Sequence, residues 1–150
     1  MEILIPLIQN PDKRIISFMQ DQTVATVCCV DQENRPYCFS CFYAWDSEKN
    51  LLYFKTSSTT HHAQLMQKNK LVSGTIQPDK LNRLAIQGIQ FSGEVLNQKD
   101  PCGLNASSVY HSKYPFALAM PGDVWTIKFT VIKMTDNTLA FGKKLHWQLN

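Results

Sequence analysis

The sequence lacks any apolar run approaching the roughly 20 residues that a membrane-spanning helix needs. It also lacks a basic stripe, because its 15 Lys and Arg residues are scattered and KKL at 143–145 is the densest basic spot. Nucleic-acid binders usually concentrate such residues on one face. We therefore expect neither a nucleic-acid nor a membrane partner. The start, MEILIP, carries no basic segment, so a secretion signal is not expected either.

Cysteine is sparse and odd in number: there are five, of which Cys28 and Cys29 are adjacent. This usage predicts no disulfide framework and a reducing compartment, namely the cytoplasm. Cys38 and Cys41 have the CxxC spacing of a metal or redox motif, but they lie in an expected strand. Residues three apart in a strand point to opposite faces. We therefore interpret both as core cysteines.

Histidine is also scarce, and its spacing does not favour a metal site. His61 and His62 are adjacent on an expected helix, where neighbours diverge by about 100°. A chelating helical pair needs a spacing of three or four residues. His111 and His146 are distant in sequence and have no ligand-like neighbours. No metal is therefore expected, and nothing around the cysteines indicates a Cys–His nucleophile pair.

What the sequence does contain is a β-rich pattern in 150 residues, which predicts one domain spanning 1–150. Asn10 as the cap, Pro11 at the first helical position and Asp12 in the first turn predict a helix start. An apolar face of Ile15, Ile16, Phe18 and Met19 predicts that the helix runs to about Asp21. The expected strands are 23–30, 36–45, 51–56, 71–76, 85–96 and 122–135. Short helices are expected at 61–70 and 101–113. Residues 139–149 predict a last strand pair, or a strand with a bulge at Gly142. The fold class is mainly β (α+β), a barrel with short capping helices.

The segment FKTSSTTHHAQL, residues 54–65, combines a strand end, four hydroxyl residues and a helix start at two histidines. The first turn of a helix offers unpaired N–H groups and the positive end of the helix dipole. Hydroxyls add donors, and histidine adds partial charge near neutral pH. Two interpretations stay open on these residues alone. The hydroxyls cap the helix, or the whole segment cradles an anion.

Three stretches carry a family resemblance: TSSTTHHAQLM at 56–66, GIQFSGE at 88–94 and TDNTLAFGKK at 135–144. Over nearly its whole length the chain resembles the pyridoxamine-5′-phosphate-oxidase-like flavin-binding split barrels, and more narrowly their small bacterial YhbP-type group. The resemblance implies a six-stranded antiparallel split barrel. It further implies a homodimer with flavin mononucleotide (FMN) bound at the subunit interface.

The resemblance also assigns residues to the cofactor. Lys55, Thr56 and Ser57 would line the flavin ring and ribityl chain. Thr60, His61 and His62 would face the phosphate. Ser40 and Gln90 would reach the ring from the barrel wall. Lys143, Lys144 and Trp147 would approach from the partner subunit, unless they form only a solvated basic tail. No side chain is assigned as a catalytic acid or base, because the flavin carries the electron chemistry.

The chain departs from this family at the two histidines, where many relatives have an Arg. Arg is permanently charged and binds phosphate through two hydrogen bonds, whereas His is a weaker, pH-dependent partner. A charge-assisted hydrogen bond contributes about 1.5–3 kcal/mol, which predicts flavin binding weaker by about one to two decades.

The predicted function is FMN binding, as an FMN-dependent oxidoreductase of unknown substrate. The alternative is a non-enzymatic module that has lost tight flavin binding and takes haem or a small anion. Oxidation of vitamin B6 itself is disfavoured. The Arg- and His-containing C-terminal segment that the true oxidase uses for its substrate has no clear counterpart here.

Overall fold

The computed structural model describes residues 9–140 and 142–149. The first eight residues, on which the prediction about a secretion signal depends, lie outside these ranges. The helices are α1 (Lys13–Asp21), α2 (His61–Lys68) and α3 (Ala106–Lys113), with 3₁₀ helices η1 (Pro101–Gly103) and η2 (Pro115–Ala119). The strands are β1 (Val24–Val30), β2 (Pro36–Asp46), β3 (Leu51–Thr56), β4 (Leu71–Ile76), β5 (Gln87–Val95), β6 (Asp123–Asp136) and β7 (Lys144–Gln148). In the described part of the chain, every helix is too short or too polar to cross a bilayer.

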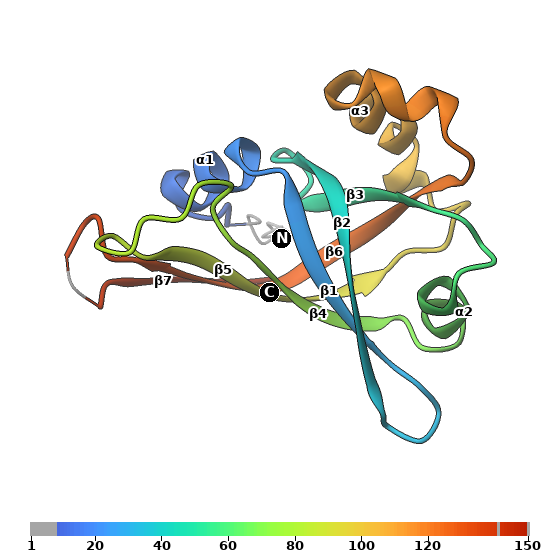
Figure 1. Ribbon diagram of the computed structural model, residues 1–150, viewed down its shortest axis with the longest axis horizontal. Helices are drawn as coiled ribbons and strands as arrows, with labels where there is room; N and C mark the ends of the chain where they lie inside the picture. The colour runs from blue at the N-terminus through green and yellow to red at the C-terminus, as the bar shows by residue number, and fades with distance from the viewer. Residues whose placement is uncertain (1–8, 141, 150) are drawn as a thin grey trace, which may run out of the picture.

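The strands form a closed antiparallel ring with one extra strand. They are hydrogen-bonded in the order β3-β2-β1-β4-β5-β6-β7, and a further pairing of β3 with β6 closes the ring of six. The long β6 strand pairs with β3 through residues 123–128, which closes the ring, and with β7 through residues 131–135, which adds the extra strand. Figure 1 shows the β1–β2 hairpin extending beyond the rest of the barrel. The predicted six-stranded antiparallel split barrel is confirmed.

The core follows from alternating side chains. In β1, Ala25, Val27 and Cys29 are buried while their neighbours are at least partly exposed, as period-two alternation requires. The barrel interior is rich in aromatic rings; those of Phe91 and Phe129 stack with centroids 4.2 Å apart. A second apolar cluster lies outside the ring and holds α3 and η2 against β2 and β3. Its buried members are Ala44, Leu51, Tyr53, Ala106, Tyr110, Tyr114 and Ala117.

The two ends of the described chain differ from the prediction. Helix α1 is capped by Asp12, which accepts a hydrogen bond from the Arg14 amide (2.9 Å), so the expected cap at Asn10 was wrong. At the other end, Gly142 lies in a turn, and one strand, β7, follows it in place of a strand pair or bulge. Trp147 is only 6% exposed and its indole donates to the Gln9 carbonyl (2.6 Å). It is therefore largely a core residue, although its rim borders a surface hollow with Gln9 and His146; an approach to the cofactor of a partner subunit stays a prediction.

The cysteine prediction was wrong in one respect. The sulfur atoms of Cys28 and Cys38 form a disulfide between β1 and β2, where the two residues lie directly opposite each other. Cys38 is exposed, so it is not a core cysteine, whereas Cys41 on the other face is free and partly buried. The opposite orientation of Cys38 and Cys41 was predicted correctly. The register that pairs Cys28 with Cys38 cannot be read from an odd cysteine count.

Candidate functional site

The barrel opens between β2 and β3, and the candidate site lies in this opening. Residues 43–46 of β2 pair with β3, but residues 36–42 pair only with β1, so one edge of that stretch is free. A hollow of about 290 Å³ borders the free edge. Its lining comes from β2, the end of β3, α2 and the segment around η2: Phe39, Ser40, Cys41, Phe42, Lys55, Thr56, His62, Tyr110, Phe116, Ala117, Met120 and Pro121.

The backbone of Ser40 is directed into the opening. Cys28 and Cys38 lie opposite each other with Cα atoms 4.2 Å apart, which marks the narrow, non-hydrogen-bonded type of antiparallel pair. Because hydrogen-bonded and non-hydrogen-bonded pairs alternate, residues 38, 40 and 42 direct their N–H and C=O groups away from β1. The Ser40 amide and carbonyl thus face the hollow. They offer a donor and an acceptor side by side.

His62 forms the far wall through two contacts. Its ring stacks on Phe39, with centroids 3.8 Å apart and planes inclined by 10°. Its Nε2 lies 2.7 Å from Thr56 Oγ1. Burial, and secondarily the charge of His61, lower the pKa of His62. The side chain is therefore neutral at neutral pH, which opposes the expectation that it supplies positive charge there.

Lys55 supplies a cation at the opposite rim. Its ammonium donates to the Ala117 carbonyl (2.6 Å) and lies 3.1 Å from His111 Nε2. Because Lys55 has only donors, His111 Nε2 accepts, and the ring proton on Nδ1 then faces the Ser107 carbonyl at 2.8 Å. This chain of contacts ties β3 to α3 and η2. Sequence reasoning missed His111, since it is 56 residues from Lys55.

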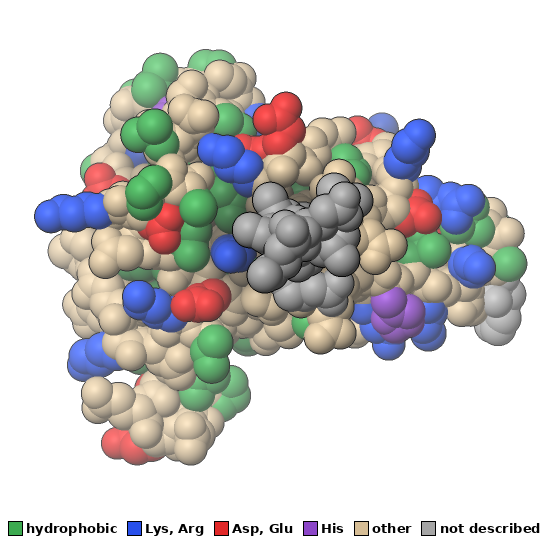
Figure 2. Space-filling model, turned by 180° about the vertical axis from the view of Figure 1, so that it is seen from behind, with side chains coloured by type: hydrophobic (Ala, Val, Ile, Leu, Met, Phe, Trp, Pro, Cys, Tyr) green, Lys and Arg blue, Asp and Glu red, His purple; other side chains and the backbone are tan. Residues whose placement is uncertain are grey.

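Aromatic and apolar side chains around η2 form the outer wall, and sequence reasoning missed these too. Phe42, Phe116 and Met120 are 46%, 58% and 56% exposed. The Phe42 ring lies 5.5 Å from that of Tyr114 and 6.2 Å from that of Phe116. Figure 2 shows apolar side chains gathered over the part of the surface where Figure 1 places α3. Alternation in β2 was the signal available for Phe42, since it shares a face with Ser40.

A glycine lets the chain close tightly behind Thr56. Gly122 has φ +118°, and a Cβ there would come within 2.9 Å of the Thr56 carbonyl carbon and oxygen and 3.1 Å of the Ser57 amide. Both its backbone conformation and its surroundings exclude a side chain. The loop before β6 thus braces the corner at which β3 ends.

Of the eight predicted cofactor residues, the structure brings four together in the hollow: Ser40, Lys55, Thr56 and His62. Thr60 lies behind them, with its hydroxyl 3.3 Å from that of Thr56. It also caps α2 by accepting from the Ala63 amide (3.2 Å), and its hydroxyl donates to the Ser57 carbonyl (3.0 Å). The capping interpretation of the hydroxyl run is therefore confirmed for Thr60. The anion cradle stays a prediction.

His61 and Gln90 lie elsewhere. The ring of His61 meets Tyr37 edge-on at 4.8 Å and borders a separate hollow beside the β1–β2 turn. Gln90 is on the outer face of β5, in the row Ser40–Thr26–Thr75–Gln90 across four strands. Three strand spacings separate Ser40 from Gln90, about 14 Å. Within one subunit the two side chains do not share a pocket.

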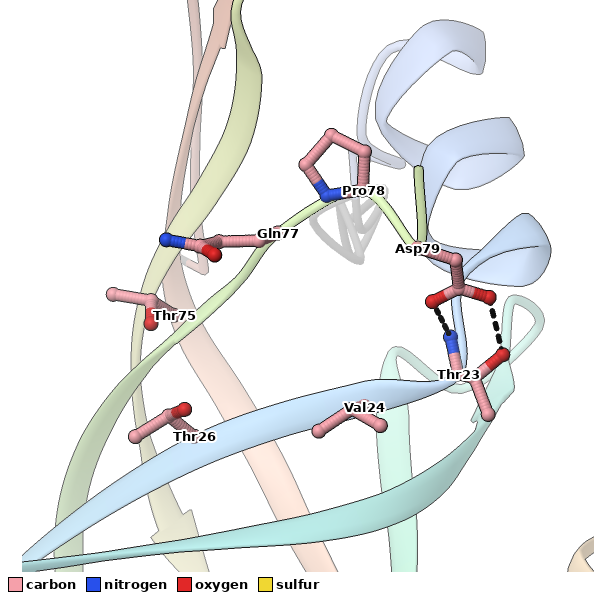
Figure 3. A pocket seen from close by; sticks show the side chains of 7 residues that line it. All are labelled: Thr23, Val24, Thr26, Thr75, Gln77, Pro78 and Asp79. Atoms are coloured by element: carbon pink, nitrogen blue, oxygen red, sulfur yellow. Dashed lines mark hydrogen bonds between the residues drawn. The ribbon is translucent and has the colours of Figure 1, made fainter. Parts of the chain in front are cut away.

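Across β2, β1, β4 and β5, this row and its nearest neighbours on the outer face carry no charged side chain, whereas the charged Lys133 of β6 lies opposite Gln90 at the end of the row. The row Ser40–Thr26–Thr75–Gln90 is followed by Cys38–Cys28–Ser73–Ser92 and flanked by the pair Phe42–Val24. Figure 3 shows Thr26 and Thr75 on one side of a hollow of about 480 Å³ in this face. On the other side, the carboxylate of Asp79 accepts from both the amide and the hydroxyl of Thr23. An uncharged face of this kind is unusual for solvent-exposed sheet and typical of the centre of an interface.

Comparison with known proteins gives the family from sequence and the fold from structure. No protein-family model matches the chain. A UPF0306 protein of Yersinia enterocolitica is 39% identical over 140 residues, covering 92% of this chain and 95% of the relative. The UPF0306 protein YhbP of Salmonella paratyphi A is 38% identical over 119 residues, covering 79% and 81%. The chain belongs to the UPF0306 family.

Solved structures of low sequence identity share the split-barrel fold. A haem-binding protein from Mycobacterium smegmatis aligns with a TM-score of 0.73 and 12% identity, over 87% of this chain and 55% of that one. This chain therefore spans about half the length of that protein. A FAD-binding protein from Mesorhizobium loti aligns with a TM-score of 0.65 and 15% identity, over 85% and 96%. At these identities the likeness shows the fold alone.

Proposed function

We propose that the protein binds FMN in the opening between β2 and β3 and acts as a flavin-dependent oxidoreductase. The observation that carries the proposal is the convergence of Ser40, Lys55, Thr56 and His62 on one hollow with aromatic walls. A flavin ring needs apolar surface for its faces and donors and acceptors for its edge. The rings of Phe39 and Phe42 provide the apolar surface. The backbone amide and carbonyl of Ser40, at the free edge of β2, provide a donor and an acceptor.

The phosphate would lie at the start of α2. Thr60 satisfies the amide of Ala63 with its hydroxyl and that of Gln64 with its carbonyl. The amides of His61 and His62 have no partner among the described residues and remain open to an anion. Because His62 is neutral and the Lys55 ammonium lies at the opposite rim, these amides would provide the attraction. Binding without an Arg is expected to be weak, as the sequence also indicates.

A second copy of the chain would complete the site. At about 290 Å³ the hollow is at the small end for a ligand pocket, and its apolar wall at Phe116 and Met120 is exposed. The row Thr26–Thr75–Gln90 of the outer face would supply the contact between subunits, and the exposed Cys38 would lie outside it, at its rim. Gln90 would then reach the flavin of the neighbouring copy. Its distance from Ser40 within one subunit would therefore be compatible with a role in cofactor binding.

When bound, FMN supplies hydride or electron transfer at its ring. This chain's own residues would hold and shield it. Ser40 would orient the ring edge, and Phe39 and Phe42 would exclude water. The substrate would enter from the exposed side, past Phe116 and Met120. No side chain in the hollow needs to act as an acid or a base for this role.

The test is an equilibrium titration of the purified protein with FMN and with riboflavin, followed by flavin fluorescence and visible absorption. FMN should bind with quenching or a spectral shift, and more tightly than riboflavin if the start of α2 holds the phosphate. Equal affinity for FMN and riboflavin would show that the start of α2 does not bind the phosphate. If neither ligand changes its spectrum between pH 6 and 8, the flavin proposal is wrong.

A second candidate function is haem binding, which one structural neighbour is named for. His62 supports this candidate because it is a neutral imidazole at the edge of an apolar hollow, and a neutral imidazole is the form that binds iron. The same preparation titrated with ferric haem distinguishes the two. A shift of the haem absorption band that His62→Gln abolishes would favour haem, whereas flavin quenching that survives added haem would favour flavin.

A further inference from the structure

A covalent link between β1 and β2 lies close to the free edge of the site. Cys28 and Cys38 are bonded through their sulfur atoms, with Cα atoms 4.2 Å apart. Both side chains point to the outer face of the sheet, where Cys38 is exposed and Cys28 partly exposed. Residues in a narrow antiparallel pair are not joined directly by backbone hydrogen bonds. The disulfide therefore joins the two strands at a point that the hydrogen-bond ladder leaves open.

The same point of β2 is held from its other face by α2. Tyr37 and Phe39 flank Cys38 in sequence and point to the opposite side of the strand. The Tyr37 ring meets His61 at 4.8 Å, and the Phe39 ring stacks on His62 at 3.8 Å. The residue that carries the exposed sulfur is thus the direct neighbour of both rings that touch the histidines. If β2 becomes more mobile at Cys38, the contact between Phe39 and His62 at the wall of the hollow should weaken.

We propose that Cys28 and Cys38 form a reversible redox site whose state sets how rigidly β2 holds Phe39 against His62. Its oxidants would be low-molecular-weight disulfides, and its reductants low-molecular-weight thiols. Exposed disulfides are the ones that exchange readily with such compounds. The remaining three cysteines are free, and none is bonded in this way: Cys29 is buried, Cys41 is partly buried and Cys102 is exposed.

The exchange balances as two successive sulfur displacements. Starting from two thiols, the thiolate of the more exposed Cys38 attacks one sulfur of the oxidant, forms a mixed disulfide and releases one thiol. The thiolate of Cys28 then attacks Cys38 Sγ, closes the protein disulfide and releases a second thiol. Two electrons pass from the cysteine pair to the oxidant, and the two cysteine protons end on the two released thiols. Reduction by two thiols is the reverse.

The redox part is tested by equilibrating the full chain in mixtures of reduced and oxidised glutathione. The mixtures are quenched with acid, the free thiols are blocked with a maleimide, and peptides are analysed by mass spectrometry. Cys28 and Cys38 should lose reactivity together in one transition, and Cys102→Ser should leave that transition unchanged. Cys38→Ser should abolish it. The proposal fails if Cys28 and Cys38 stay reactive at every ratio, take up glutathione independently, or if Cys38 bonds to Cys29 instead.

The coupling to the hollow is tested by comparing oxidised protein, reduced protein and the Cys28→Ser, Cys38→Ser double variant. In the last two, amides in residues 36–42 should exchange with solvent several-fold faster, and the ring resonances of His62 should move. Those of the distant, exposed His146 should not. Faster exchange confined to the turn at 31–35, with His62 unmoved, would refute the coupling. No flavin is used, so this result is independent of whether the protein binds FMN.

Discussion

The imidazole of His62 lies flat against the ring of Phe39, with centroids 3.8 Å apart and an interplanar angle of 10°. The same imidazole contacts Thr56 Oγ1 through Nε2 at 2.7 Å. One side chain of α2 therefore joins the free edge of β2 to the end of β3. The contact spans the opening of the barrel, so the protonation state of His62 bears on both stability and binding.

The first prediction concerns acid stability. Burial lowers the pKa of His62 below the value of about 6.5 in an unfolded chain, so the unfolded state takes up the proton first. The contribution of neutral His62 is therefore complete above about pH 6.5 and is lost as pH falls towards its folded pKa. Unfolding free energy measured by urea titration from pH 7.5 to 5 should fall less steeply in His62→Gln than in the parent. His146→Gln, at an exposed position, should keep the parental slope; parallel curves for all three proteins would contradict the prediction.

The second prediction concerns the cation at the rim. Lys55→Met removes the ammonium that contacts the Ala117 carbonyl and His111. Loss of a charge-assisted hydrogen bond of about 1.5–3 kcal/mol should weaken FMN binding about ten- to a hundredfold. Lys128→Met, at an exposed site on β6, is the matched control and should bind as the parent does. Fluorescence titration gives both constants, and equal constants for the two variants would remove Lys55 from the site.

The third prediction concerns how the outer wall is fastened. The hydroxyl of the buried Tyr114 donates to the Tyr43 carbonyl (2.5 Å) and also lies 3.2 Å from the Thr23 carbonyl. Tyr114→Phe leaves the buried Tyr43 carbonyl without this donor, which should lower the unfolding free energy by about 1–3 kcal/mol. Tyr37→Phe, at a position 42% exposed, should change it by less than about 0.5 kcal/mol. Denaturant titration of the two variants decides, and similar midpoints would show that the hydroxyl of Tyr114 does not hold η2 in place.

The sequence was sufficient for much of the fold because local signals and side-chain alternation agree there. TVATVCCV and LLYFKT became β1 and β3, and the hydroxyl run before His61 does contain the cap of α2, at Thr60. The family resemblance assigned Ser40, Lys55, Thr56 and His62 to one site from the sequence alone. A family relationship carries information on tertiary structure that composition lacks.

What the sequence could not supply is strand register and long-range contact. The Cys28–Cys38 bond depends on which residues of β1 and β2 face each other, and no residue pattern fixes that. His111 reaches Lys55 across 56 residues from a helix with a weak apolar face. The position of Gln90 depends on the order of strands in the sheet, which places β1 and β4 between it and Ser40.

The last prediction concerns the second copy. Thr75 lies near the middle of the uncharged outer face, in register with Thr26 on one side and Gln90 on the other. If that face joins two subunits, Thr75→Lys places an unpaired charge at the centre of a buried contact, which is strongly unfavourable. Sedimentation velocity should then show a dimer for the parent and a monomer for Thr75→Lys. Gln98→Lys adds the same charge in an exposed loop and should remain dimeric. FMN affinity should fall with dissociation, because Thr75 does not line the hollow of its own subunit. A monomeric parent, or a Thr75→Lys variant that stays dimeric, would place the subunit contact on another face or exclude it.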